Sequence, residues 1–481
     1  MKKFILTILG LIFISGSLTA QTVLPVIGSE QGFVYDRLER EQILSGYLGE
    51  IHLGPFSDFN NSNDFEPFSY LQNKDQNRLS LFGYATENFS ARKYYHSNAY
   101  ESLRGGFAGH PLNNIFLYAN FILDEQKAED SAYTGKKWRG LAGGVESAFI
   151  NFSFSQGYIR AGRFSSFWGI RQSLILSPKN QLDGLEYHLK WGRLGLTYRL
   201  AELDNFEIDI FNDVFRRYLA AHRLDLFLAK NLRIGFFETV IFGGSGRTID
   251  LNYLNPILFF HSDQLNDNIN DNISLGFDAS YIYKNKIYLY GQLLVDDFQI
   301  ENKSAGDNEP DQYALRVGSQ VVGIKNKLDL ELSYTRITYR TFSQSLAINK
   351  YLFEGNPIGD VLGNDYDQLT LEAKYWHKPV LAFGLLFDYL RRGEGRIEDH
   401  WSPVWNWVED YSEPFPTGTV EKTLTLALLA EGFVFDHVYF NIKTGLQKID
   451  NHNHNVCNDV RLGFINLTLS TFFDQPLNLA F

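Results

Sequence analysis

The sequence predicts an all-β protein, a transmembrane antiparallel β-barrel of about 18 strands with a small N-terminal helical segment. Three observations support this prediction. The chain begins with a segment typical of exported proteins, and most of the remainder alternates apolar and polar residues with a period of two. The connections between these alternating runs are short and long in turn.

The composition excludes several other classes of protein. The chain has 481 residues, of which 40 are Phe, 27 are Tyr and one is Cys, and its formal net charge is −12. A single Cys excludes a disulfide scaffold and a multi-Cys zinc or iron–sulfur site. The acidic balance argues against a nucleic-acid partner, which needs a basic surface. The aromatic excess favours one large β-structure.

Residues 1–20 have the features of a secretory signal peptide. Lys2 and Lys3 precede an apolar run from Phe4 to Ile14, and Leu18-Thr19-Ala20 fits a cleavage site. The apolar run is too short to favour the alternative, an uncleaved anchor. No later stretch of about 20 apolar residues occurs in the sequence, so no transmembrane helix is expected. Together with the strands below, this predicts export to the outer membrane of a Gram-negative cell.

Residues 21–77 differ from the rest of the chain because they show little strand pattern. Val34, Leu38 and Leu44 fall near one face of a helix. We expect a small segment on the periplasmic side with one or two short helices. A mobile tail before the first strand is the alternative, since termini are often poorly ordered.

The barrel is expected over residues 78–481, where long alternating strands recur. In the run 273–283 the odd-numbered positions are apolar or aromatic and the even-numbered ones are mostly polar. Lys284-Asn285-Lys286 turns the chain, and the run 287–296 alternates again. Similar runs begin at Leu328, Leu369 and Leu424. Each has about ten residues, the length that crosses a bilayer at a tilt.

The connections favour a membrane barrel over a soluble sandwich or propeller. Short turns on one side and long loops on the other are typical of outer-membrane barrels, and so is an aromatic C-terminal residue, here Phe481. Short connections are expected near Gly192, Asn231, Asn285, Asn326, Lys378 and Phe435. Long polar connections are expected at about 299–312, 341–366, 393–422 and 447–458.

Polar residues are frequent between 160 and 298, at positions where lumen-facing side chains are expected. We expect opposite charges among them to pair and brace the barrel wall. An Arg facing lipid at mid-depth costs about 2–4 kcal/mol, so Arg223 is expected to face the lumen. A binding site is the alternative interpretation. The residues concerned are Arg163, Trp168, Asp183, His222, Arg223, Glu238, Arg247, Asn255, His261, Asp278, Gln292, Asp296 and Asp297.

The sequence does not predict an enzyme. A lipid hydrolase needs a Ser and a His held by a third group, and no G-x-S-x-G pattern occurs in the chain. Residues 243–246 lack the trailing lysine of a phosphate loop, and residues 267–272 lack the spacing of an EF-hand. The short His-containing tract 450–454 is weak evidence for a metal. No catalytic residue, metal or cofactor is therefore expected.

The long connection 393–422 is the candidate carbohydrate-binding loop. Three of the seven Trp residues lie in it, interleaved with carboxylates. Trp faces stack on sugar rings, and carboxylates accept hydrogen bonds from hydroxyls. The alternatives are that the loop packs on itself over the pore mouth, or that the Trp residues belong to the interfacial belt. The candidate residues are His400, Trp401, Trp405, Trp407 and Tyr411.

Short motifs follow one another in order along residues 160–300. They are Gly162-Arg163, Trp168-Gly169, Leu174–Ser177, Asp183-Gly184-Leu185, His222-Arg223-Leu224, Phe237–Gly243, Leu254-Asn255-Pro256 with His261 and Gln264, Leu275–Asp278 and Tyr290–Phe298. Their order resembles the Wzi-type capsule-assembly family of outer-membrane proteins, in its Bacteroidota form. The helix from Tyr35 to Leu44 is also similar to the start of the related RemB-type gliding-motility surface proteins.

The resemblance implies a barrel of about 18 strands with a periplasmic-side helical element. It also implies a non-enzymatic, lectin-like protein that binds capsular or other surface polysaccharide and helps to attach or assemble it at the cell surface. The implied partners are the polysaccharide, outer-membrane lipid, and proteins of polysaccharide export or gliding. Two alternatives stay open: a surface component of gliding or adhesion with a protein partner, and a diffusion porin.

Overall fold

A computed structural model describes most of the chain. The described residues are 29–48, 78–93, 97–130, 133, 135–166, 168–170, 173–177, 180–208, 213–262, 271–297, 309–434 and 437–478. The predicted signal peptide 1–20, Gln264 and the C-terminal Phe481 lie outside them. Within the described residues, no helix is both long and apolar enough to span a membrane.

The main sheet has 20 strands, and 18 of them make a closed wall. The other two, the short β4 and β9, pair only with β5 and β10. The wall strands are β1 (Arg78–Arg92), β2 (Asn98–Leu112), β3 (Ile115–Asp124), β5 (Leu141–Phe154), β6 (Gly157–Phe164), β7 (Leu182–Trp191), β8 (Leu194–Glu202), β10 (Asp213–Ala229), β11 (Leu232–Ser245), β12 (Asn272–Tyr283), β13 (Ile287–Asp297), β14 (Gln312–Ile324), β15 (Leu328–Ile337), β18 (Tyr366–Lys378), β19 (Leu381–Arg392), β20 (Glu421–Val434), β21 (Val438–Asp450) and β22 (Val460–Asn478).

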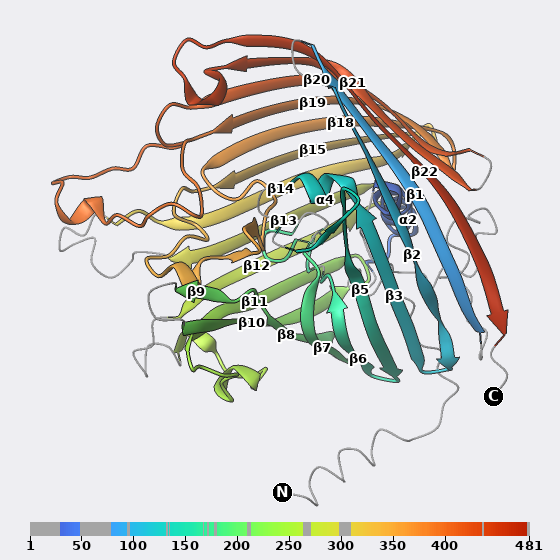
Figure 1. The fold of residues 1–481 in the computed structure, drawn as a ribbon, viewed down its shortest axis with the longest axis horizontal. Coiled ribbons are helices and arrows are strands. Elements are labelled where there is room, and N and C mark those ends of the chain that lie inside the picture. The colour runs from blue at the N-terminus through green and yellow to red at the C-terminus, as the bar shows by residue number, and fades with distance from the viewer. Residues whose placement is uncertain are drawn as a thin grey trace, which may run out of the picture.

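The barrel closes because its first strand pairs with its last. β1 and β22 run antiparallel from Arg78 opposite Asn478 to Arg92 opposite Phe464, and Figure 1 shows the blue β1 beside the red β22. Every other wall strand pairs with its sequence neighbours in the same antiparallel sense. Closure leaves no free sheet edge, which is what a spanning β-structure requires. The predicted fold class and strand number are confirmed.

The alternation seen in the sequence sets which side chains face the lumen. Along β12, Ser274 and Asp278 are buried on one face, while Phe277 on the opposite face is exposed on the outer surface. Along β13, Gln292 is buried and Leu293 is exposed. Successive side chains of a strand point to opposite faces, so on β12 and β13 the outward face is apolar and the inward face carries most of the polar side chains.

The two ends of the barrel differ. One end has tight turns, for example at 192–193, 230–231 and 284–286; we call it the short-turn end. The other, the long-loop end, carries the remaining short elements. These are α4 (Glu125–Glu129), β4 (Lys137–Trp138), β9 (Phe206–Ile208), η3 (Asn252–Leu254), η5 (Ala347–Asn349), β16 (Leu352–Phe353), β17 (Asn356–Pro357), η6 (Val404–Asn406) and η7 (His452–His454).

The helix α2 (Ser29–Ser45) lies inside the short-turn end of the lumen (Figure 1). Phe33 packs against the rings of Trp376, Phe433 and Tyr439, which line the inner wall. Leu48 N donates to Lys230 O at 2.8 Å. The helix predicted before the first strand is therefore present, and it is docked against the wall.

Two connections from the long-loop end also enter the lumen. They are the segment 165–181, as far as it is described, and the connection 338–365. Tyr351 Oη donates to Ile175 O at 3.0 Å, and Ser177 N donates to Ile358 O at 2.7 Å. Buried apolar side chains of both segments form one cluster with lumen-facing residues of β7, β8, β10, β11, β13, β14, β15 and β18. The lumen is thus occupied at two levels, by α2 and by these loops.

Candidate functional site

An ion cluster lies on the inner face of three neighbouring strands, β10, β11 and β12, against the inserted segment 165–181. Arg223 is fully buried, and its Nε donates to Asp225 Oδ2 at 2.9 Å while its Nη2 donates to Asp278 Oδ1 at 2.9 Å. Arg233 lies beside it and donates to the carbonyl oxygen of Gly169. The prediction that Arg223 faces the lumen and pairs there is correct. Charges this deeply buried are tolerated because each has an opposite charge and hydrogen bonds.

The segment 165–181 is fastened to this cluster. Leu174 N donates to Gln292 Oε1 at 2.6 Å. Gly169 has φ +83°, and a Cβ there would lie 2.5 Å from Asp278 Oδ2, so the backbone approaches the carboxylate as only glycine allows. Trp168, the neighbour of this glycine, is buried in the lumen cluster. Trp168, Asp278 and Gln292 therefore lie close together, and they hold a loop inside the barrel.

A second lumen contact fastens the other inserted connection. Asp296 accepts from Ser274 Oγ at 2.6 Å and from Phe342 N at 2.7 Å. Asp297 follows it, half-buried, at the end of β13. The lumen polar residues thus brace the wall and the loops that fill it, which is the first of the two interpretations that the sequence allowed.

Seven of the predicted lumen residues are not in the lumen, and five of them lie on or over the outer face of the wall. His222 adjoins Arg223 and Glu238 adjoins Phe237, so on alternating strands they face outward. The prediction placed both members of the His222-Arg223 pair inside, which the period of two forbids. Arg247, Asn255 and His261 belong to the loop between β11 and β12, and this loop lies over the outer face of the wall.

Arg163 and Asp183 were also predicted to lie in the lumen, and the structure places them at the rim of the barrel. They form an ion pair of 2.5 Å at the long-loop rim of β6 and β7, and their side chains are 40% and 55% exposed. Solvent screens such a pair, so it contributes little to stability.

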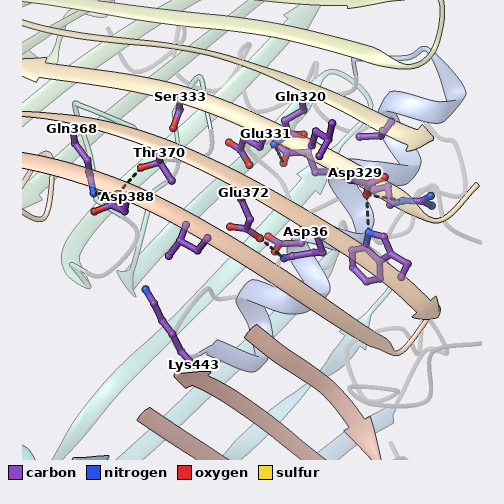
Figure 2. A pocket seen from close by; sticks show the side chains of 17 residues that line it. Asp36, Gln320, Asp329, Glu331, Ser333, Gln368, Thr370, Glu372, Asp388 and Lys443 are labelled. Atoms are coloured by element: carbon purple, nitrogen blue, oxygen red, sulfur yellow. Dashed lines mark hydrogen bonds and ion pairs between the residues drawn. The ribbon is translucent and has the colours of Figure 1, made fainter. Parts of the chain in front are cut away.

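A cavity of about 330 Å³ lies between α2 and the inner faces of β14, β15, β18, β19 and β21 (Figure 2). Asp388 Oδ1 accepts from Gln368 Nε2 at 2.7 Å and from Thr370 Oγ1 at 2.8 Å. Lys443 points into the space from β21. Carboxylates outnumber cations among its lining side chains. The size suits water or a small polar solute, and a polymer would not fit.

The aromatic loop 393–420 is built around an arginine from another connection. The rings of Trp401 and Trp405 meet edge to face with centroids 6.0 Å apart. The Arg340 guanidinium lies 5.1 Å from the first ring and 4.6 Å from the second. Arg340 Nε also donates to Glu413 Oε1 at 2.9 Å, and Tyr411 Oη donates to the same oxygen at 3.1 Å. Cation–π attraction and an ion pair therefore order these side chains.

The remaining candidates of the loop face solvent. The side chain of Trp407 is 72% exposed, at the end of η6, and His400 is exposed one residue before Trp401. An exposed indole on an ordered turn presents a flat apolar face with little conformational entropy left to lose on binding. The sequence predicted these residues as one set. The structure separates them into a packed group, Trp401, Trp405 and Tyr411, and an outward-facing one.

The loop is held at its base by Asp365. Its carboxylate accepts from Gly395 N at 2.8 Å and from Thr417 N at 2.9 Å. Lys350 Nζ donates to the carbonyl oxygens of Glu398 and Asp399, at 2.7 and 2.6 Å. Buried acceptors that satisfy several backbone groups fix a loop in place. The aromatic surface is therefore a pre-formed feature of the long-loop end.

A second open space lies at the long-loop end of the barrel. It has a volume of about 470 Å³ and separates the β16–β17 hairpin from the inner faces of β2, β3 and β5. Arg104 and Glu146 pair in it at 2.8 Å, and Lys127 lies at its rim. Charged side chains of both signs and the amides of Asn180 and Gln181 make this surface able to hydrogen-bond hydroxyl groups.

Sequence reasoning missed Arg340, Glu413 and Asp365. Arg340 and Asp365 belong to the connection 338–365, and Glu413 carried no pattern that singled it out. Their role arises from packing between two loops, which no local spacing reveals. Among the described residues, no group of three or more His, Cys, Asp or Glu side chains is arranged to hold a metal ion.

The fold and these surfaces define a class: a closed 18-stranded β-barrel of membrane-spanning type, with a filled lumen and ordered external loops. A family model described as capsule assembly protein Wzi matches residues 73–459. The chain belongs to the Wzi capsule assembly family. A comparison with curated proteins gave no match.

The solved structure of a Wzi protein supports the fold. Wzi of Escherichia coli, described as a carbohydrate-binding β-barrel of the outer membrane involved in group 1 capsule assembly, is 14% identical, with 81% of this chain and 83% of that one covered and a TM-score of 0.55. OccD3 of Pseudomonas aeruginosa is 11% identical (82% and 91% covered, TM-score 0.48), and OccAB2 of Acinetobacter baumannii is 11% identical (82% and 98% covered, TM-score 0.48).

Proposed function

We propose that this chain is a non-enzymatic outer-membrane barrel that binds capsular or other surface polysaccharide and helps to attach or assemble it at the cell surface. Family membership and the carbohydrate binding described for Escherichia coli Wzi support the proposal. The family match supports the Wzi family. The narrower assignment to its Bacteroidota form, and the relation to RemB-type proteins, stay predictions.

The observation that carries the proposal is the ordered aromatic surface at the long-loop end. Trp407 is exposed beside Trp401 and Trp405, which Arg340 holds in place. Exposed carboxylates of Glu409 and Asp410 follow directly. Stacking on the apolar faces of sugar rings, with hydrogen bonds from hydroxyls to carboxylates, needs this combination. Weak contacts repeated along a polymer then give retention through multivalency, without any bond being broken.

The filled lumen favours this function over a diffusion porin. Helix α2 occupies the short-turn end, and the segments 165–181 and 338–365 occupy the middle. An open porin keeps an aqueous channel through its barrel. A surface component of gliding or adhesion remains the second candidate, and it would use the same exposed loops to contact a protein.

The test replaces Trp407 by Ala. Loss of one stacking contact, worth about 0.5–1.5 kcal/mol, should weaken binding of purified surface polysaccharide about 2- to 10-fold. Retention on the cell pellet should fall in parallel. Trp407 is a cleaner probe than Trp401 or Trp405, whose removal also releases Arg340.

Trp191→Ala is the matched control, because Trp191 is 53% exposed and lies at the short-turn end. It should leave polymer binding unchanged at equal levels of folded protein. Unchanged retention in Trp407→Ala would refute the loop as the binding surface. Polysaccharide still attached in a deletion strain would refute the attachment role, and loss of spreading with the polymer intact would favour the gliding alternative.

A further inference from the structure

The described first part of the loop between β11 and β12, residues 246–262, folds down over the outside of the barrel. Its residues Tyr253 and Phe260 are fully buried against Tyr218 of β10 and Phe242 of β11. These strand residues face outward, because their outward neighbours further along, Leu224 and Phe236, are 40% and 48% exposed. In Figure 1 the loop is the lobe beside β10 and β11. We call residues 246–262 the outer flap.

Several backbone N–H groups of the outer flap have hydrogen-bond partners within the protein. Glu238 of β11 reaches it from mid-strand: its carboxylate accepts from Phe260 N and from His261 N, both at 2.7 Å, and lies 3.2 Å from His222 Nε2. The flap also closes its own turns. Leu254, Asn255, Ile257 and Leu258 each donate their N–H to a group of residues 251–255.

This arrangement matters because irregular backbone is excluded from hydrocarbon unless its polar groups are satisfied by protein. A carboxylate on the outer wall would also be costly there if it were not paired. The flap covers the Glu238 carboxylate, and the carboxylate accepts hydrogen bonds from two of the flap's N–H groups. The side chain of Glu238 is only 2% exposed.

The outer flap turns an apolar face away from the wall. Five of its apolar side chains are exposed, and they are Ile249 at 42%, Leu251 at 80%, Leu254 at 38%, Ile257 at 85% and Phe259 at 51%. Below the flap the outward surface continues with Leu224, Phe236 and Phe277, all exposed. The apolar surface is thus continuous from the strands onto the flap.

The strands beneath the flap offer too short an apolar band of their own. On β10, below the flap, the exposed outward apolar residues run from Leu224 to Leu228, which is four residue steps or about 10 Å along the barrel axis at a tilt of about 45°. A lipid-facing band is about 25 Å tall. The flap lies where the missing part of that band belongs.

We propose that the outer flap lies in the outer leaflet of the membrane, with Ile249, Leu251, Leu254, Ile257 and Phe259 against lipid acyl chains. The inference rests on the proposed outer-membrane location of the barrel. It commits to lipid as the occupant because the flap continues the lipid-facing wall. A second copy of the chain or another protein on this face is an outcome of the test.

The test places single Cys residues in a Cys457→Ser background, which removes the one native Cys. Ile257→Cys probes the flap, Leu428→Cys is the lipid-facing reference on β20, and Trp407→Cys is the aqueous reference. Each purified variant is labelled with a fluorophore and reconstituted into phosphatidylcholine vesicles with and without doxyl-labelled lipid. Iodide serves as the aqueous quencher. Heat-modified migration in gels verifies that every variant is folded.

We expect the label at position 257 to follow the label at position 428, with strong quenching by doxyl lipid and at least about 5-fold weaker quenching by iodide than at position 407. Iodide quenching equal to that at position 407 overturns the inference. Protection from both quenchers overturns it in favour of a second copy on the flap. If position 428 also fails to contact lipid, the outer-membrane location itself is refuted.

A second variant tests the role of Glu238. Glu238→Gln keeps the size of the side chain but offers the flap one acceptor oxygen in place of two. We expect it to raise iodide quenching at position 257 at least 2-fold while leaving position 428 unchanged. Unaltered quenching at both positions would show that the carboxylate does not hold the flap in place.

Discussion

At the scale of single residues, the lumen ion cluster is where one substitution has the largest effect. Asp278→Ala leaves the guanidinium of Arg223 buried with only Asp225 as its near partner. Breaking a buried, hydrogen-bonded pair costs about 3–5 kcal/mol. The free energy of unfolding, measured in urea by the gel shift of the folded barrel, should fall by about that amount.

Asp183→Ala is the comparison, because it breaks an ion pair whose side chains are largely exposed at the rim. Such pairs contribute at most about 1 kcal/mol. If both substitutions destabilised the barrel equally, the buried cluster would not be the brace that its geometry indicates.

Residue-level prediction from the sequence succeeded where alternation alone decided the outcome. Arg223, Asp278 and Gln292 lie on the lumen side of strands whose opposite faces are plainly apolar. It failed for His222 and Glu238, because polarity was taken as a sign of the lumen. The outer flap that covers these two side chains is a product of tertiary packing, and its position cannot be predicted from a local sequence pattern.

At the scale of elements, the aromatic loop should respond to pH. Burial raises the pKa of Glu413 above its ordinary value of 4.5, against the opposing effect of Arg340. The folded loop therefore binds this proton more tightly than the unfolded loop does. Its stability is fully present below pH 4.5 and falls as the pH rises from there through the raised pKa.

Limited proteolysis of the loop, followed across this pH range, measures the effect. Cleavage within 393–420 should become faster as the pH rises past 4.5. Glu413→Gln, which does not titrate, should remove that dependence while keeping an acceptor for Arg340. A pH profile identical in both proteins would contradict the assignment.

Elements were more predictable than their contacts. The strands, the short turns and the N-terminal helix follow from period, length and turn residues, all of which are local. The last long connection was expected from residue 447, but β21 continues to Asp450 because it stays paired with β20 up to Lys422. The insertion of 165–181 and 338–365 into the lumen depends on packing partners far away in the sequence.

At the scale of the whole molecule, the filled lumen predicts low conductance. The intact protein in a planar bilayer should pass far less current than an open barrel of the same strand number. Removing residues 29–48 should raise the conductance only partly, because the two inserted loops remain. Conductance of the intact chain at the level of an open porin would contradict the packing described here.

The position of α2 has a consequence for how the barrel is made. Arg40 donates to Asn326 O and pairs with Asp329, and Asp36 pairs with Lys374, so partners stand about 290 to 340 positions apart in the chain. The helix α2 is synthesised before the strands of the wall, but its docking site does not exist until β15 and β18 have formed. During biogenesis α2 therefore stays undocked until these strands have formed, and it is enclosed when β22 pairs with β1.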